Sequence, residues 1–424
     1  MAKELSFKER LKLKTIRHRN RALRHSIIAL IVLAIPFFGH QLFFSASPPS
    51  DTRPDNVEYR MSIVGDMMMG RHVHDAAVRS GESMERVFDY VHPFFEESDY
   101  VTGNFENPIL DVDDEEVEAM MDDAELHNKD IHIYSEPWAI DALDSAGFDS
   151  VNFANNHALD FGDLSLQQTL AHTEDAPFDT VGIGDAMNLS EEEKEEGATD
   201  AAEMSYFDIN EDVRAGIIGF TDVFVEGFSA QDYVGGVFTP QNQGMMELRN
   251  RLLQAKVPEE EDGGGADIVI VHIHWGDEYQ VGSNDRQEEL AQYLANYGAD
   301  IIIGHHSHVL EPVTVVEGAD GNRAIVMNGM GNFVFDQGWT RTKESAMAQF
   351  DFLDDGSKQL SFVPMYIENT SPRETAGWTK FYRDYRIFRT LRKELDNEWW
   401  TVEDGRLNID LDKAGVLEGV QITS

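Results

Sequence analysis

The residues with the clearest chemical potential are three histidines within four positions, His305, His306 and His308. They directly follow an apolar run of three isoleucines at 301–303. A continuous apolar run of this kind predicts a strand buried on both faces, as in parallel sheets with helices on either side. In open α/β sheets, ligands bind at the carboxyl ends of the strands, where these histidines lie. Because neutral imidazoles ligate divalent transition metals, the sequence predicts a metal site here.

The direction of the three side chains follows from the alternation of a strand. Successive side chains of an extended chain point to opposite sides. His306 and His308 are therefore expected to share one face and to bind the metal. His305 is expected to point away from them, unless Gly304 bends the chain first.

Five further polar clusters stand at the ends of predicted strands. They are GDMMMGR at 65–71, NFENP at 104–108, NNHALDFG at 155–162, HWGDEY at 274–279 and GNFVFDQ at 331–337. Along the chain an Asp is followed by an Asn or Glu, then by Asn-His, a lone His and finally His-x-His. Binuclear phosphoesterases present their ligands in this order, each from the end of a different strand. Two divalent metals held in this way can activate a water molecule and neutralise charge on a phosphoryl oxygen.

Regular elements between the clusters predict the fold class. An apolar segment at 267–274, an amphipathic helix at 285–297 and the strand at 300–303 form a βαβ unit. The core is therefore predicted to be α/β with much parallel pairing. A further strand and a Gly turn are expected at 322–336, and the aromatic-rich segment beyond about 340 contains a candidate hairpin.

Composition excludes several classes of function. The chain has 424 residues and no cysteine, which rules out disulfides, thiolate metal sites and cysteine nucleophiles. Residues 1–25 hold nine Lys or Arg against two Glu, a balance of +7. Because the net charge of the whole chain is −44, the remaining residues together carry a charge of −51. Such an excess of negative charge argues against nonspecific binding to nucleic acid.

The basic segment precedes a stretch at 26–45 that carries no charged side chain and has about the length of a bilayer span. We predict a single-pass membrane anchor with the basic flank in the cytoplasm and the bulk of the chain extracellular. A cleaved signal peptide is the alternative, although a basic region of 25 residues is long for one. The expected organisation is a cytoplasmic segment at 1–25, a transmembrane helix at 26–45, a linker at 46–58, a folded domain at 59–340 and an extension packing on that domain at 341–424.

The five clusters and GHHSHVLEP together resemble the CapA family of poly-γ-glutamate capsule biosynthesis proteins, over roughly residues 60–337. The resemblance implies a calcineurin-like metallophosphoesterase fold, with layered sheets flanked by helices. It also implies a membrane-attached protein that faces outward and works with the polyglutamate synthase subunits to make or export the polymer.

The resemblance also implies the site residues. The expected ligands of a divalent metal (Mn, Fe or Zn) are Asp66, Asn104, Glu106, Asn156, His157, His274, His306 and His308. Met68 replaces the second member of the usual Asp-x-His pair and ligates hard divalent metals poorly, while His272 and His305 are not needed as ligands.

Catalytic and substrate-binding roles are expected at neighbouring positions. The catalytic candidates are Glu106, His157 and His274, and the substrate-binding candidates are Arg71, Trp275, Glu278 and Asn332. Trp275 is interpreted either as a wall of the site or as ordinary packing. Glu278 and Asp160 are expected to orient ligand histidines through the second ring nitrogen, with surface carboxylates as the alternative.

Two functions from different classes remain open at this point. The first is a metal-dependent hydrolase at the cell surface, acting on a phosphoester or on a γ-glutamyl amide. The second is an accessory protein of poly-γ-glutamate synthesis or export. The acidic chain repels a polyanion, so contact must be local, through a bound cation or through Arg71, Arg286 or Arg341. Because Met68 removes a ligand, we favour the accessory role.

Overall fold

The computed structural model describes residues 6–19, 21–43, 48–49, 52–81, 83–121 and 129–422, and the side chains of the second helix as far as Ile35. The chain divides into two compact units. One unit comprises Met1–Ser47 and Ala376–Phe381, and the other comprises Pro48–Thr375 and Tyr382–Ser424.

The first unit contains α1 (Phe7–Arg19) and α2 (Ala22–Phe43). Helix α2 covers most of the segment 26–45 for which the sequence predicts a membrane anchor, and residues 44 and 45 lie outside the described residues. Among the helices that the structure describes, none combines the length and the apolar character needed to cross a membrane. The prediction of a transmembrane helix at 26–45 is therefore not supported by the described helices.

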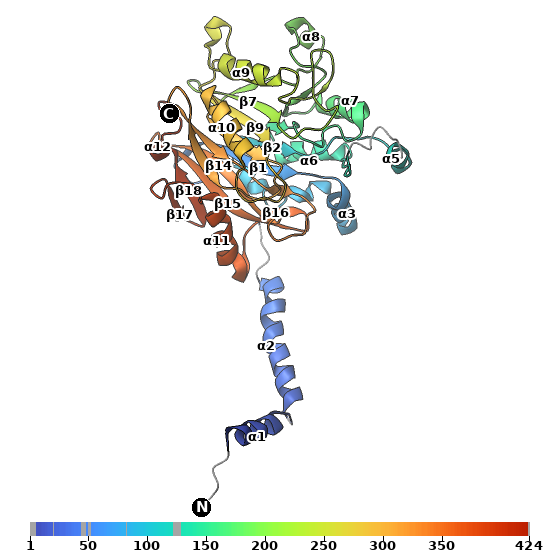
Figure 1. Cartoon of the computed structure of the whole chain (residues 1–424), viewed down its shortest axis with the longest axis vertical. Coiled ribbons are helices and arrows are strands. Elements are labelled where there is room, and N and C mark those ends of the chain that lie inside the picture. Colours follow the sequence, from blue (N-terminus) through green and yellow to red (C-terminus); the bar gives the residue numbers. More distant parts are fainter. Residues whose placement is uncertain are drawn as a thin grey trace, which may run out of the picture. The chain divides into compact units, whose positions relative to one another are not determined.

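The second unit is built on two sheets (Figure 1). The larger one has the order β17-β18-β15-β14-β1-β2-β3-β4, with β13 beside β1 and β16 beside β15. Its strands are β1 (Val57–Met67), β2 (Tyr100–Phe105), β3 (Ser150–Asn152), β4 (Asp179–Val181), β13 (Asn332–Val334), β14 (Glu344–Leu353), β15 (Lys358–Glu368), β16 (Ser371–Glu374), β17 (Trp400–Glu403) and β18 (Arg406–Asp410). Strands β1 to β4 run parallel, and β14, β15, β18 and β17 continue the sheet from β1 in antiparallel order.

The smaller sheet has the order β11-β12-β10-β9-β7-β6. Its strands are β6 (Ser205–Asp208), β7 (Arg214–Thr221), β9 (Ile268–His274), β10 (Ile301–His305), β11 (Val313–Glu317) and β12 (Arg323–Met327). Strands β7, β9, β10 and β12 are parallel. The predicted βαβ unit is confirmed as β9, α10 (Asp285–Asn296) and β10.

Three apolar cores explain the layers. Side chains from both sheets meet in a shared core, with Ile63 of β1 opposite Ile303 of β10 in the same cluster. The other face of the smaller sheet, with Ile302, packs against Leu294 of α10. A third core covers the other face of the larger sheet and includes Leu143 of α6. The apolar run at 301–303 is thus buried on both faces, and the fold is a mixed α/β arrangement of sheets flanked by helices, as predicted.

The remaining elements are short. The helices are α3 (Arg71–Ser80), α4 (His92–Glu96), α5 (Asp114–Met121), α6 (Trp138–Ala146), α7 (Gly162–Thr173), α8 (Glu191–Glu195), α9 (Gly244–Ala255), α11 (Lys380–Leu391) and α12 (Leu411–Ala414), with 3-10 turns at Met84–Phe88, Glu259–Glu261 and Gly377–Thr379. Strands β5 (Ile183–Gly184) and β8 (Gly236–Val237) form a small separate pair.

The segment after 340 is an integral part of the larger sheet. Strand β14 pairs with β1, and β15 pairs with β14 and β18. A buried ion pair joins β1 to β14: the guanidinium of Arg60 donates to both carboxylate oxygens of Asp351, at 2.7 and 2.8 Å. Both side chains are almost completely buried. Residues 344–353 therefore stabilise the strand that carries Asp66.

Candidate metal centre

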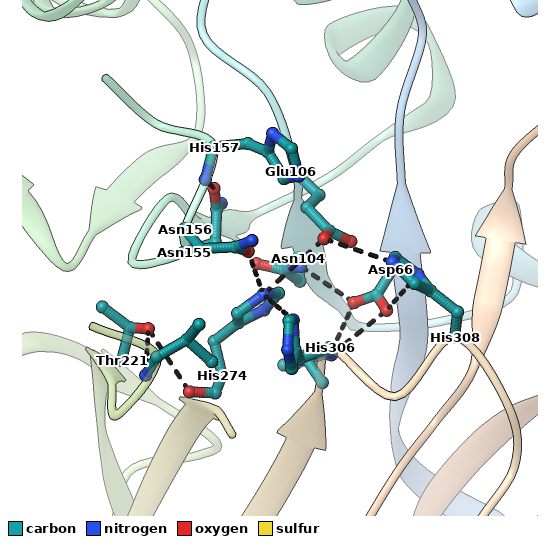
Figure 2. A network of polar contacts seen from close by, with 12 residues as sticks. Asp66, Asn104, Glu106, Asn155, Asn156, His157, Thr221, His274, His306 and His308 are labelled. Carbon is teal, nitrogen blue, oxygen red and sulfur yellow. Dashed lines mark hydrogen bonds and ion pairs between the residues drawn. The ribbon is translucent and has the colours of Figure 1, made fainter. Parts of the chain in front are cut away.

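The carboxyl ends of strands from both sheets meet at one polar cluster (Figure 2). In the larger sheet, Asp66 of β1 pairs with Asn104 of β2. In the smaller sheet, His274 of β9 pairs with His305 of β10. Parallel strands end at the same edge, so residues far apart in the sequence arrive at the same level. The edge predicted from the sequence is therefore where the cluster lies.

One group of ligand atoms is formed by Glu106, His274 and His306, whose ligand atoms all lie within 4.8 Å of one another. His274 Nε2 lies 3.1 Å from His306 Nδ1 and 3.6 Å from Glu106 Oε1. The side-chain oxygen of Asn156 lies 2.8 Å from the same Nε2 atom. Three further atoms with lone pairs, from His306, Glu106 and Asn156, thus lie close to His274 Nε2.

A second group is formed by Asp66, Glu106 and His308. His308 Nδ1 lies 3.5 Å from Asp66 Oδ2, and His308 Nε2 lies 3.6 Å from Glu106 Oε1. Glu106 belongs to both groups. The arrangement therefore provides two neighbouring positions for a cation with one shared carboxylate.

Glu106 tests whether these residues fit a metal. Its side chain is fully buried, and neither carboxylate oxygen has a hydrogen-bond partner within the described parts of the chain. Leaving a buried carboxylate unpaired is costly, and a coordinated cation removes that cost. The mixture of carboxylate, imidazole and amide oxygen suits Mn²⁺, Fe²⁺ or Zn²⁺. The donor set therefore fits a divalent metal ion.

The two histidines of the first group are in the neutral form that can bind a metal ion. Burial and the neighbouring His306 hold the pKa of His274 well below its usual range. Burial, together with the charge of His308, lowers the pKa of His306 to about 3. Both imidazoles are neutral at physiological pH, so their lone pairs are available to a cation.

The second group keeps a proton. Burial raises the pKa of Glu106 well above its usual range. Burial alone would lower the pKa of His308, but the carboxylates of Glu106 and Asp66 raise it to about 9. The pair of Glu106 and His308 therefore shares a proton at neutral pH, and a cation bound here would displace it.

Asn104 was expected as a ligand, but the structure uses both of its polar atoms elsewhere. Its Nδ2 donates to Asp66 Oδ1 at 2.9 Å, and its Oδ1 accepts from Asn152 Nδ2 at 2.8 Å. The two amides form a chain that ends on the carboxylate of Asp66. Asn104 therefore orients Asp66, and its role as a metal ligand stays a prediction.

His157, expected both as a ligand and as a catalytic group, lies at the edge of the cluster and is not a member of either group. Its Nδ1 lies 2.7 Å from Asp160 Oδ2, so Asp160 orients the ring, as expected. The ammonium of Lys129 lies 3.0 Å from the same nitrogen and also pairs with Asp160. Sequence reasoning missed Lys129, because a single lysine next to an acidic run carries no motif.

His305 differs from the expectation that it points away. Its Nδ1 lies 3.3 Å from Asp66 Oδ1, and its Nε2 lies 2.9 Å from His272 Nδ1. The next link runs from His272 Nε2 to Thr102 Oγ1 at 2.9 Å. Simple alternation failed because the backbone leaves the extended region, with φ of 88° at His306 and 56° at His308.

The four expected substrate-binding residues are placed differently. Trp275 is fully buried in the core beside α10, and its indole donates to Asn328 O, so the structure does not bring it to the site. Asn332 is also fully buried and contacts His308 Nδ1 at 2.9 Å, behind the ligands. Arg71 is partly exposed and pairs with Asp336 at 2.7 Å. Glu278 is exposed, and its charge acts on Glu106.

Met68 agrees with the expectation that it is no ligand. Its side chain is fully buried in the core that includes Val64 and Phe105. The usual second ligand of the first strand is therefore replaced by apolar packing.

Layered sheets flanked by helices, with buried carboxylates and histidines at the strand ends, define a metallophosphoesterase-like protein with a candidate metal centre. The family described as Bacterial capsule synthesis protein PGA_cap matches residues 60–337. The chain belongs to this family, which confirms the resemblance inferred from the six clusters.

Two relatives match nearly the whole chain, and a third matches less than half of it. A protein named PGA biosynthesis protein CapA, from Bacillus subtilis, is 35% identical over 419 residues, 99% of this chain and 100% of the relative. The Capsule biosynthesis protein CapA of Bacillus anthracis is 34% identical over 426 residues, covering 99% and 94% of the two chains. A probable polyglutamine synthesis accessory protein of Mycobacterium tuberculosis is 24% identical over 183 residues, 43% of this chain and 44% of the relative.

Proposed function

We propose that this chain is an accessory protein of poly-γ-glutamate capsule synthesis or export, and that it works through a divalent metal ion bound at the described cluster. Membership of the capsule synthesis family and the names of two full-length relatives support the role in capsule formation. The partners proposed on this basis are the polymer and the subunits of its synthase.

The observation that carries the metal-dependent part is the unpartnered carboxylate of Glu106 between His274 and His308. A chain with a net charge of −44 repels a polymer of carboxylates. A bound divalent cation supplies a local positive charge that salt does not screen away, because it lies within contact distance of the ligand. The metal centre is thus the point at which an acidic protein can hold an acidic polymer.

The test is complementation of a capsule-forming strain that lacks its own related protein. We expect the parent chain to restore surface polymer, and His306→Ala to restore less than about a tenth of it. His72→Ala is the matched control, because the side chain of His72 is 74% exposed and lies on α3 outside both ligand groups. Equal polymer from His306→Ala and His72→Ala, at equal protein levels, would contradict the proposal.

The alternative function is a metal-dependent hydrolase, favoured by His157 and the carboxylate of Asp160 that orients it. A metal pair in such a site polarises the bond to be cleaved and activates water. Glu106, Asp66, His308, His274, His306 and Asn156 would hold the metals, and neutral His157 would accept a proton on the ring nitrogen that faces away from Asp160. A phosphodiester and a γ-glutamyl amide, each offered to the full chain with Mn²⁺, test this: turnover that His306→Ala abolishes supports hydrolysis, and no turnover rejects it.

We also propose that the folded unit works at the outer face of the cell membrane. This location rests on the basic segment at 1–25 and the uncharged stretch at 26–45. Protease added to wall-stripped cells with an intact membrane tests this location. We expect the acidic unit to be digested, and full protection of that unit would reject the location.

A further inference from the structure

Tyr279 adopts a backbone conformation that needs an explanation. Its φ is 63°, in the left-handed region that an aromatic residue rarely occupies. Among the other non-glycine residues with positive φ, His306 and His308 belong to the ligand groups themselves. Strained backbone persists only where the surroundings hold it, and it gathers at functional sites. Tyr279 has no role in the metal centre described above, so its conformation points to a further role.

The structure holds Tyr279 at both ends. Its backbone N–H donates to Ser307 O at 2.8 Å, and its hydroxyl oxygen accepts from Gln337 Nε2 at 3.0 Å. The side-chain oxygen of Gln337 in turn accepts from Asn332, which contacts the ligand His308. A chain of hydrogen bonds therefore fixes the tyrosine relative to the metal centre.

The ring of Tyr279 lies beside the centre and is extended outward by a second aromatic residue. Its centroid lies 5.8 Å from that of His308 and 4.8 Å from that of Trp339, whose ring is tilted by 73°. Trp339 is 62% exposed and Tyr279 is 38% exposed. We call these two residues the rim pair. An aromatic surface exposed next to a ligand site is typical of a contact region for a partner molecule.

The charges around the rim pair restrict what it can bind. Glu278, the residue directly before Tyr279, is acidic and exposed. The rim therefore carries negative charge. Such a rim repels the carboxylates of an anionic chain and favours an uncharged, planar group that can stack on a ring and offer an N–H to Glu278. An amide unit has these properties.

We propose that Tyr279 and Trp339 form a subsite for the amide backbone of a γ-glutamyl chain, one of whose carboxylates is bound at the metal centre. This inference rests on the proposed function, since it takes the capsule polymer as the ligand. The two kinds of group in the polymer would thus bind at different places. A carboxylate binds the cation, and the amide planes stack on the rim pair.

The test is calorimetric titration of the full chain, loaded with Zn²⁺, with a γ-linked glutamate tetramer. We expect Trp339→Ala to bind the tetramer about five- to tenfold more weakly, the loss of one aromatic contact, and Trp339→Phe to recover part of the affinity. Trp378→Ala is the matched control, since that tryptophan is similarly exposed at 64%. Zn²⁺ affinity should be the same in all four proteins.

A second probe separates the amide from the carboxylate. Short polyacrylate carries carboxylates without amides, so its binding should not change in Trp339→Ala. Equal affinity of parent and Trp339→Ala for the tetramer, or no binding of the tetramer to the loaded parent, would overturn the subsite. An equal loss for both polymers would also overturn it, because the rim pair would then act on charge alone. The capsule complementation described above is independent of all these results, so the subsite can fail while the proposed function stands.

Discussion

Two buried carboxylates, Asp351 in the larger sheet and Glu106 directly after one of its strands, differ in their hydrogen bonding. Asp351 receives two hydrogen bonds from Arg60, and the third arm of that guanidinium donates to Thr52 O, so every strong partner is satisfied within the protein. Glu106 is equally buried, yet both of its oxygens lack a hydrogen-bond partner in the described part of the chain. The first arrangement joins two strands, whereas the second leaves both carboxylate oxygens without a hydrogen bond and open to a cation.

The difference separates stability from function within a single sheet. Removing one partner of a paired buried charge lowers stability, because it leaves the other charge uncompensated. An unpaired buried carboxylate costs free energy in the metal-free protein, and that cost is recovered when a cation binds. Substitutions at the two positions should therefore have opposite effects on stability and on metal affinity.

The largest expected effect is on stability, at the ion pair. Asp351→Ala should lower the free energy of unfolding by about 3–5 kcal/mol, because it leaves the buried guanidinium of Arg60 without its carboxylate. Urea denaturation measures this, and Asp355→Ala in the exposed turn before β15 is the control. The double variant Arg60→Met with Asp351→Leu should lose less than Asp351→Ala alone. A loss below about 1 kcal/mol for the single variant would mean that the pair does not stabilise the sheet.

The reverse pattern is expected at the metal centre. Glu106→Gln should weaken the binding of Mn²⁺ or Zn²⁺ by about a hundredfold or more, because it removes the carboxylate shared by both ligand groups. The melting temperature of the metal-free protein should stay the same or rise, because neither carboxylate oxygen of Glu106 makes a hydrogen bond that the variant would lose. Calorimetry and a thermal melt in chelator measure the two quantities, with the exposed Glu289→Gln as the control. A lower melting temperature with unchanged metal affinity would place Glu106 with Asp351 as a structural carboxylate.

The edge at which the centre forms was predictable from sequence, because it follows from apolar runs that end in polar residues. The βαβ unit around 267–303 and the candidate ligands His274, His306 and His308 were identified on that basis. The roles of Asn104 and His305 were not, because they depend on which atom meets which across the two sheets. The burial of Trp275 was also undecidable, since the residue after a strand faces either core or solvent.

The pairing of β14 with β1 was hidden for a different reason. These strands are separated by more than 270 residues in the chain, and antiparallel pairing over such a distance leaves no local pattern. The bond between Arg60 and Asp351 could therefore not be read from the sequence, although each residue stands in an apolar strand where a lone charge is unusual.

Glu311 is an intermediate case between the two carboxylates. One oxygen accepts from Gln287 Nε2 at 2.9 Å, and the other has no partner among the residues described. Burial raises the pKa of Glu311 from 4.5 to about 7. Because the folded-state pKa lies above the unfolded value, folding favours the protonated acid. Its contribution to stability is present below about pH 4.5 and is lost as the pH rises through about 7.

Glu311→Gln should therefore stabilise the protein by about 3 kcal/mol at pH 8, and by less than about 1 kcal/mol at pH 5. The variant is uncharged at every pH and keeps the shape of the side chain. Denaturation of parent and variant at the two pH values measures the difference, and Glu317→Gln on the exposed edge of β11 serves as the control. A stabilisation that is the same at both pH values would show that Glu311 does not ionise in this range.

The smallest expected effect is on metal affinity, in variants of a buried chain of polar contacts. This chain runs from the metal centre into the structural core. It passes from Asp66 to His305, then to His272 and to Thr102, with contacts of 3.3, 2.9 and 2.9 Å. His272 and His305 are completely buried, so each link fixes the orientation of the next.

If this chain of polar contacts positions Asp66 for a cation, the effect of each residue on metal affinity should fall with its distance from that carboxylate. We expect His272→Phe to weaken Zn²⁺ binding by about tenfold and Thr102→Val by about twofold. Calorimetry measures the affinities, and the visible spectrum of bound Co²⁺ reports whether the ligand geometry changes in His272→Phe but not in Thr102→Val. Equal affinities and unchanged spectra in both variants, together with reduced stability, would assign the chain to the structural class of Arg60 and Asp351.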